Sequence, residues 1–120
     1  MTPYALYLHI PFCRQRCSYC DFNTYTTLND LQPAYVTALA AEMRQVGAMS
    51  AAGGDPKPPV RTIFFGGGTP SLLTIPQVGH LLDTARTSFA VANDAEITME
   101  ANPGTVTADW LAAVRALGVN

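Results

Sequence analysis

Three cysteines, the only ones in the chain, lie within eight residues of one another. Cys13, Cys17 and Cys20 form a C-x3-C-x2-C spacing directly after an apolar segment. Clustered thiolates are typical of a metal site, because soft sulfur ligands favour zinc and iron–sulfur clusters. Three thiolates cannot all pair as disulfides within one chain, and they leave one coordination position for another ligand. Since iron–sulfur clusters are commonly held by four cysteines, three cysteines favour chemistry at the metal over electron storage alone.

A structural zinc site is the main alternative for these cysteines. Three cysteines and one histidine form a known zinc ligand set, and His9 is the candidate fourth ligand. His9 lies within a predicted strand, however, and only a short segment containing Pro11 separates it from Cys13. The spacing therefore favours an iron–sulfur site and leaves zinc as the alternative.

Two further features suited to ligand contact follow predicted strands. The run Gly66-Gly67-Gly68 would let a ligand approach the backbone without a Cβ in the way, although a simple tight turn would also explain it. It is not a phosphate loop, because no Lys-Ser or Lys-Thr pair follows. Glu100 alternates with Ile97 and Met99, so it lies on the less apolar face of its strand. A solvated carboxylate at the rim is the alternative interpretation of Glu100.

The elements that must position these features alternate between strand and helix. Strands are predicted at Ala5–Ile10, Arg61–Phe65 and Glu96–Glu100, and helices from near Asn29 or Asp30 through Val46, from Thr74 to Phe89, and from Thr107 to Gly118. This alternation predicts a parallel sheet with right-handed crossovers, either doubly wound or part of a barrel. Ligands of both folds bind at the C-terminal ends of the strands. The cysteines, the glycine run and Glu100 are therefore expected at one rim.

Composition narrows the functional classes. Nearly half of the residues (48%) are apolar and only 13% are charged, which excludes a disordered chain. The net charge of −2, without a basic stripe, gives no indication of nucleic-acid binding. The first residues lack the basic n-region of a signal peptide, so none is expected, and the apolar run Ala5–Ile10 is too short to cross a bilayer. Free thiols favour a cytoplasmic location. Residues 1–120 are expected to be the N-terminal part of a longer protein.

Three motifs resemble those of the radical S-adenosylmethionine (SAM) superfamily. They are Tyr7-Leu-His-Ile-Pro-Phe-Cys13, Phe64-Phe-Gly-Gly-Gly-Thr-Pro-Ser71 and Met99-Glu-Ala-Asn-Pro-Gly104. Together they resemble the branch that contains HemW-like heme chaperones and oxygen-independent coproporphyrinogen III oxidases. The resemblance covers essentially the whole chain. It implies an α/β fold made of the first three βα units of a partial, TIM-like radical SAM barrel, within the N-terminal part of the core domain.

The resemblance also implies cofactor roles. Cys13, Cys17 and Cys20 would hold three irons of a 4Fe–4S cluster, and the fourth iron would bind the amine and carboxylate of SAM. In this family a reduced cluster cleaves SAM to methionine and a 5′-deoxyadenosyl radical, with an electron donor such as flavodoxin or ferredoxin. The residues expected near SAM are Tyr7, Tyr19, Gly67, Gly68, Thr69 and Glu100.

Phe22 separates the two members of this branch. The oxidase pattern has a further cysteine two residues after the third, where this chain has Phe22, and a long segment before its first strand. Both departures favour a heme chaperone, which would bind heme as cargo and pass it to an acceptor hemoprotein. The alternative is the oxidase, which decarboxylates a porphyrin substrate, coproporphyrinogen III. A cysteine-rich zinc module is the second alternative.

Overall fold

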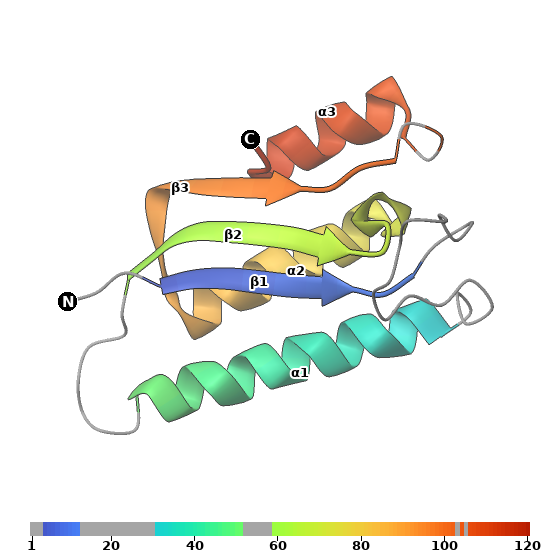
Figure 1. Ribbon diagram of the computed structural model, residues 1–120. Helices are drawn as coiled ribbons and strands as arrows, with labels where there is room; N and C mark the ends of the chain where they lie inside the picture. Colours follow the sequence, from blue (N-terminus) through green and yellow to red (C-terminus); the bar gives the residue numbers. More distant parts are fainter. Residues whose placement is uncertain (1–3, 13–30, 52–58, 103, 105) are drawn as a thin grey trace.

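The chain folds into the parallel sheet that the sequence predicts, and its helices lie on one face of the sheet (Figure 1). The structure, a computed structural model, describes residues 4–12, 31–51, 59–102, 104 and 106–120. The sheet has the strand order β1-β2-β3, and both neighbouring pairs are parallel. The elements in chain order are β1 (Tyr4–Ile10), α1 (Gln32–Ala51), β2 (Pro59–Gly67), the short 3-10 helix η2 (Pro70–Leu72), α2 (Ile75–Ser88), β3 (Ala90–Met99) and α3 (Ala108–Leu117).

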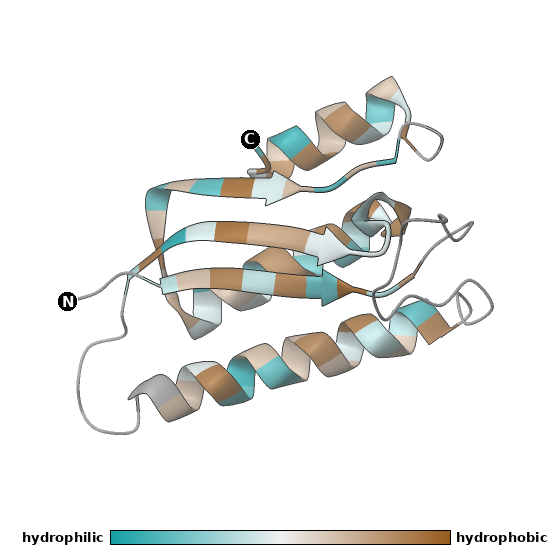
Figure 2. Ribbon diagram, in the orientation of Figure 1, coloured by the Kyte–Doolittle hydropathy of each residue, from teal (hydrophilic) through white to brown (hydrophobic). Residues whose placement is uncertain are grey.

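The hydrophobic core lies between the sheet and its helices (Figure 2). Successive strand side chains point to opposite faces, so every second residue of a strand enters this layer. The helices complete it with residues three and four positions apart, which share one helix face. The buried residues include Leu8, Ile10, Ile63, Phe65 and Ile97 from the strands and Val36, Ala40, Met43, Val78, Leu81, Leu82, Ala85 and Val114 from the helices.

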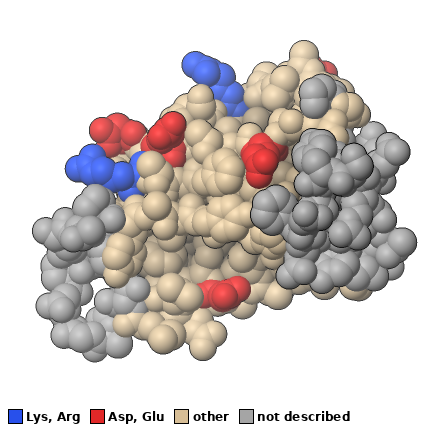
Figure 3. Space-filling view, in the orientation of Figure 1, with Lys and Arg blue, Asp and Glu red and all other residues tan. Residues whose placement is uncertain are grey.

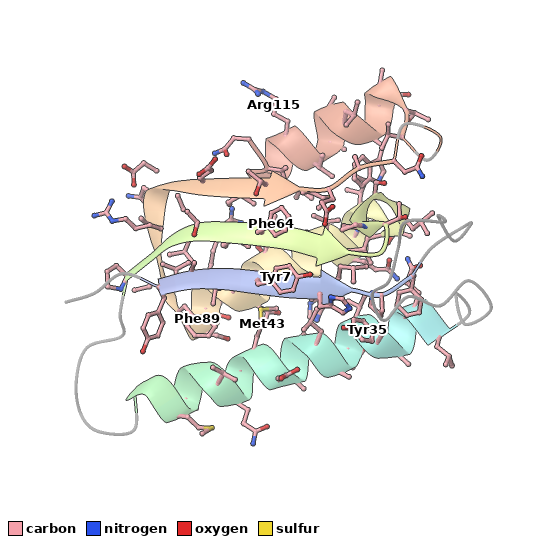
Figure 4. All side chains as sticks on the ribbon, viewed as in Figure 1. Tyr7, Tyr35, Met43, Phe64, Phe89 and Arg115 are labelled. Atoms are coloured by element: carbon pink, nitrogen blue, oxygen red, sulfur yellow. The ribbon has the colours of Figure 1, made fainter. Side chains whose placement is uncertain are left out.

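No described helix covers the opposite face of the sheet. Tyr7, Phe64 and Thr98 are neighbours across the three strands on this face. Tyr7 is 57% exposed and Phe64 is 38% exposed, although both are aromatic (Figure 4). In the space-filling view of this face, few of the described side chains are charged (Figure 3). The sheet therefore presents a largely uncharged, partly aromatic surface on the side that a barrel would enclose.

Strand β3 is longer than the sequence predicts. Residues 96–99 pair with residues 62–65 of β2, but β3 begins at Ala90, where residues 90–91 pair with residues 59–60. A register shift separates the two stretches and leaves Asn93 and Asp94 exposed between them. These polar residues interrupt the alternation, so only the second stretch carries a strand pattern. The expected start of the first helix lies outside the described residues, within which α1 begins at Gln32.

Side-chain caps fix the ends of α2 and α3 as predicted. Thr74 and Gln77 form a capping box: the Gln77 amide donates to Thr74 Oγ1 (3.2 Å), and the Thr74 amide donates to Gln77 Oε1 (2.9 Å). Thr107 Oγ1 accepts from the Trp110 amide (3.1 Å) at the start of α3. Gly118 follows α3 with a φ of 120°, a left-handed conformation that glycine adopts readily.

Asn120 lies along the outer edge of β3. Its amide donates to the Ile97 carbonyl (2.8 Å), and its side chain accepts from the Ile97 amide (3.0 Å) and donates to the Ala95 carbonyl (3.2 Å). These bonds occupy polar backbone groups of β3 on the side away from β2.

Gly47 allows α1 to approach the end of α2, and we expect its replacement to be destabilising. A Cβ on Gly47 would lie 2.4 Å from the Ser88 carbonyl oxygen, a backbone atom that cannot move alone. Gly47→Ala should lower the free energy of unfolding by about 1–3 kcal/mol, because the overlap outweighs the higher helix propensity of alanine. Chemical denaturation followed by circular dichroism measures this difference.

Gly79→Ala on α2 is the matched control. A Cβ there would contact Leu117 at 3.6 Å, an ordinary van der Waals distance. This variant should be as stable as the wild type or more stable by up to about 1 kcal/mol. A Gly47→Ala protein as stable as Gly79→Ala would contradict the account of the α1–α2 contact.

Candidate cofactor site

The glycine run is hydrogen-bonded to the segment that leads to the first cysteine. The amide of Gly68 donates to the Ile10 carbonyl (2.7 Å), and the amide of Thr69 donates to the Phe12 carbonyl (2.7 Å). These bonds continue the pairing of β1 and β2 beyond the ends of both strands. The glycine turn and the residues immediately before Cys13 therefore lie side by side at the C-terminal rim of the sheet.

Glu100 joins this rim from the third strand. Its amide donates to the Phe65 carbonyl (3.0 Å), and its carboxylate Oε1 accepts from the Gly67 amide (3.1 Å). The Glu100 side chain remains exposed. The expectation that Glu100 and the glycine run converge at one rim is confirmed.

Gly66 lies beneath the side chains of Phe64, Glu100 and Tyr7, which leave no room for a Cβ. A Cβ on Gly66 would lie 2.6 Å from Phe64 Cε1, 2.7 Å from Glu100 Oε1 and 3.0 Å from Tyr7 Cε1. Gly66 is itself buried, so its missing side chain lets the ends of these three side chains pack directly against the strand backbone. Any other residue would push them apart and move the Glu100 carboxylate.

Gly67 is required for its backbone conformation as well as its size. Its φ is +108°, which side-chain-bearing residues rarely adopt. A Cβ here would lie 2.7 Å from both Cε1 and Nδ1 of His9 and 3.1 Å from the Ile10 carbonyl oxygen. The His9 ring thus packs directly against the glycine turn.

Tyr7 brings an aromatic ring and a hydroxyl to the same place (Figure 4). Its ring stacks on Phe64 with centroids 5.7 Å apart and an interplanar angle of 24°. Its Oη lies 3.1 Å from His9 Nδ1, and the histidine tautomer decides which group donates. Burial and then the negative charge of Glu100 raise the pKa of Tyr7, so the phenol stays neutral at physiological pH.

Tyr35 approaches this rim from α1. Its hydroxyl donates to the His9 carbonyl (2.5 Å), and its ring meets the Phe12 ring edge-on, with centroids 5.4 Å apart. Burial raises the pKa of Tyr35 most, and the negative charges of Glu42 and of ionised Tyr7 raise it further. The hydroxyl therefore remains a donor at neutral pH.

Comparison with known proteins decides the family. The model of the radical SAM superfamily matches residues 7–120. The chain belongs to the radical SAM superfamily. It is 46% identical to the heme chaperone HemW of Escherichia coli over 121 residues, which is all of this chain and 31% of that protein. It is also 41% identical to the oxygen-independent coproporphyrinogen III oxidase of Synechocystis, covering 99% of this chain and 25% of the relative.

A solved structure agrees with the radical SAM fold. The chain matches the E. coli coproporphyrinogen III oxidase HemN, described as a radical SAM enzyme, with a TM-score of 0.86 and 34% identity. The match covers 98% of this chain and 26% of that structure. The chain thus spans about a quarter to a third of the length of these relatives. The predicted α/β fold, the start of a radical SAM barrel, is confirmed.

Radical SAM membership implies two cofactors, SAM and an iron–sulfur cluster, and the described rim is compatible with SAM. SAM carries an ammonium and a carboxylate on its methionine end. The rim offers the exposed Glu100 carboxylate beside the partly exposed backbone of Gly67 and Gly68. These features suit a small zwitterionic ligand held close to the backbone.

The predicted metal ligands lie outside the described residues, as do Tyr19 and Phe22. The assignment of Cys13, Cys17 and Cys20 to a cluster stays a prediction. Within the described part of the chain, no group of three His, Cys, Asp or Glu residues is arranged to hold a metal ion. No helix in that part is both long enough and apolar enough to cross a membrane.

The sequence does not reveal the places of two residues at the rim, Gly66 and Tyr35. Gly66 was part of a recognised glycine run, but the run itself does not say which glycine faces the side chains of the neighbouring strands. Tyr35 fits the apolar stripe of its helix, and its hydroxyl was the available signal, since a buried tyrosine normally has a hydrogen-bond partner.

Proposed function

We propose that the protein is a radical SAM heme chaperone that binds heme and passes it to an acceptor hemoprotein. The observation that carries the choice is Phe22, which stands where the oxidase pattern has its additional cysteine. The 46% identity to a HemW heme chaperone supports the same choice. Flavodoxin or ferredoxin is the proposed electron donor, and a thiolate-held metal site would favour the reducing cytoplasm as its location.

The proposed metal site is a 4Fe–4S cluster held by Cys13, Cys17 and Cys20. The cluster would supply an electron to SAM bound at its fourth iron. The short segment Pro11–Phe12, which precedes the first cysteine, is tied to the glycine turn by the Thr69 amide. The chain would thereby keep the metal ligands next to the surface that receives SAM.

The proposed SAM contacts depend on which polar groups at the rim already form hydrogen bonds within the chain. The amides of Gly67, Gly68 and Thr69 donate within the chain. Contacts from this turn to the SAM ammonium would therefore come from carbonyl oxygens, and the Glu100 carboxylate would accept a further bond. Tyr7 would cover one side of the methionine end, and Tyr19 would lie near the adenine.

Heme binding without porphyrin decarboxylation is the expected result for the reconstituted protein. Heme titration should give a saturable change in the heme absorption band. Incubation with coproporphyrinogen III, SAM and a reductant without oxygen should leave the porphyrinogen unchanged, because the oxidase cysteine is replaced by Phe22. E. coli coproporphyrinogen III oxidase is the positive control for the second assay.

The oxidase is the second candidate, and the structural match to HemN favours it. Decarboxylation of coproporphyrinogen III with stoichiometric consumption of SAM would reverse the order of the two proposals. Absence of both heme binding and decarboxylation would reject both.

A further inference from the structure

Strand β1 is an edge of the described sheet, and its C-terminal end runs directly into the cysteine segment. The bonds from Gly68 to Ile10 and from Thr69 to Phe12 hold this end on the β2 side. On the opposite side there is no neighbouring strand within the described residues. The position of the residues before Cys13 therefore depends on what holds the outer edge of β1.

Tyr35, a residue of α1, holds the outer edge of β1. The Ile10 carbonyl points towards β2, so the carbonyl of the preceding residue, His9, points to the outer edge. The Tyr35 hydroxyl donates to this carbonyl at 2.5 Å, the bond that a further strand would otherwise make. The same ring packs edge-on against Phe12, which is only 3% exposed.

His9 connects this bond to the rest of the rim. Its ring lies within 2.7 Å of the position that a Cβ on Gly67 would take, and its Nδ1 is 3.1 Å from Tyr7 Oη. A shift of the His9 backbone would therefore move a ring that touches both the glycine turn and Tyr7. The contacts form one continuous path from α1 to the surface next to Glu100.

We propose that Tyr35 is a positioning residue of the cofactor site, whose hydroxyl fixes the backbone of His9 and thereby sets the segment before Cys13 against the glycine turn. The inference rests on the proposed binding of SAM and an iron–sulfur cluster at this rim. Tyr35 itself contacts the backbone of β1 and Phe12, so its effect on the cofactors passes through these residues.

Tyr35→Phe tests the proposal, because it removes the hydroxyl and keeps the ring that packs on Phe12. In the metal-free protein, the amides of Gly68 and Thr69 should exchange with deuterium about 5–10-fold faster than in the wild type. In the reconstituted protein, iron content should be unchanged and the Kd for SAM should rise about 5–10-fold. The change that SAM produces in the electron paramagnetic resonance spectrum of the reduced cluster should also be altered.

Tyr4→Phe is the matched control, since it deletes a hydroxyl at the exposed, opposite end of β1. It should leave the exchange rates, the SAM affinity and the spectrum as in the wild type. An equal effect of both variants would show a general loosening of β1 and overturn the proposal. Exchange that accelerates in Tyr35→Phe without a change in SAM affinity or spectrum would also overturn it, leaving only a structural role.

The cofactor assignment and the positioning role of Tyr35 can be disproved separately. A wild-type protein that binds neither cluster nor SAM would overturn the cofactor assignment, and the role of Tyr35 with it. A wild type that binds both, with Tyr35→Phe indistinguishable from it, would overturn the role of Tyr35 alone. None of these readouts uses heme, so they do not depend on whether the protein is a chaperone or an oxidase.

Discussion

Replacing any one of Cys13, Cys17 and Cys20 with alanine is expected to abolish the iron–sulfur cluster. Wild-type protein reconstituted with iron and sulfide without oxygen should be brown and hold about four irons per chain. Each cysteine would bind a different iron, so losing one thiolate leaves that iron without a protein ligand. Iron and sulfide analysis, with visible absorption, measures the loss.

Ser18→Ala is the control for this experiment, because it changes a side chain between the second and third cysteines without removing a thiolate. It should retain the wild-type iron content and colour. A colourless wild-type protein that contains stoichiometric zinc would instead establish the zinc alternative. Zinc would also leave the protein without the redox chemistry of its superfamily.

Gly66→Ala is expected to weaken SAM binding strongly while leaving the protein folded. The new methyl group would overlap the ends of the Phe64, Tyr7 and Glu100 side chains, which can rotate away. Their movement spares the backbone but displaces the Glu100 carboxylate and the aromatic rings beside it. Hydrogen bonds to charged groups contribute about 1.5–3 kcal/mol, so the Kd for SAM should rise about 10- to 100-fold. Calorimetry on the reconstituted protein measures this change.

Glu100→Gln separates the loss of charge from the loss of shape. The amide oxygen of glutamine can still accept from the Gly67 amide, as Glu100 Oε1 does at 3.1 Å, but the negative charge is gone. SAM binding should weaken within the same range if the ammonium is held here. Gly79→Ala serves as the folded control, with wild-type affinity. Unchanged affinity in both Gly66→Ala and Glu100→Gln would place SAM elsewhere.

The sequence predicted the convergence at the rim because two strong rules apply together. Alternating strands and helices imply parallel strands, and parallel strands bring their C-terminal ends to one side. The hydrogen bond between the Gly67 amide and the Glu100 carboxylate therefore agrees with the prediction, although the two residues come from different strands. Caps at Thr74 and Thr107 were equally predictable, since they depend on neighbouring residues alone.

The remaining features depend on contacts that sequence spacing does not encode. A register shift and the exposed residues Asn93 and Asp94 separate the first half of β3 from the second, so no continuous strand pattern marks the first half in the sequence. The approach of α1 to β1, which places the Tyr35 hydroxyl on the His9 carbonyl, depends on how the helix packs. The role of Gly66 likewise depends on side chains from all three strands.

The hydrogen bonds from Gly68 to Ile10 and from Thr69 to Phe12 have a consequence for how the protein matures. The cysteines are synthesised before the glycine run that binds the residues preceding them, and these long-range contacts form only after the intervening helix has folded back. The nascent chain would therefore carry its three thiolates unorganised and open to oxidation or to the wrong metal. Cluster loading is expected to follow the pairing of β1 with β2, so delivery of iron and sulfide belongs to the end of folding rather than to its beginning.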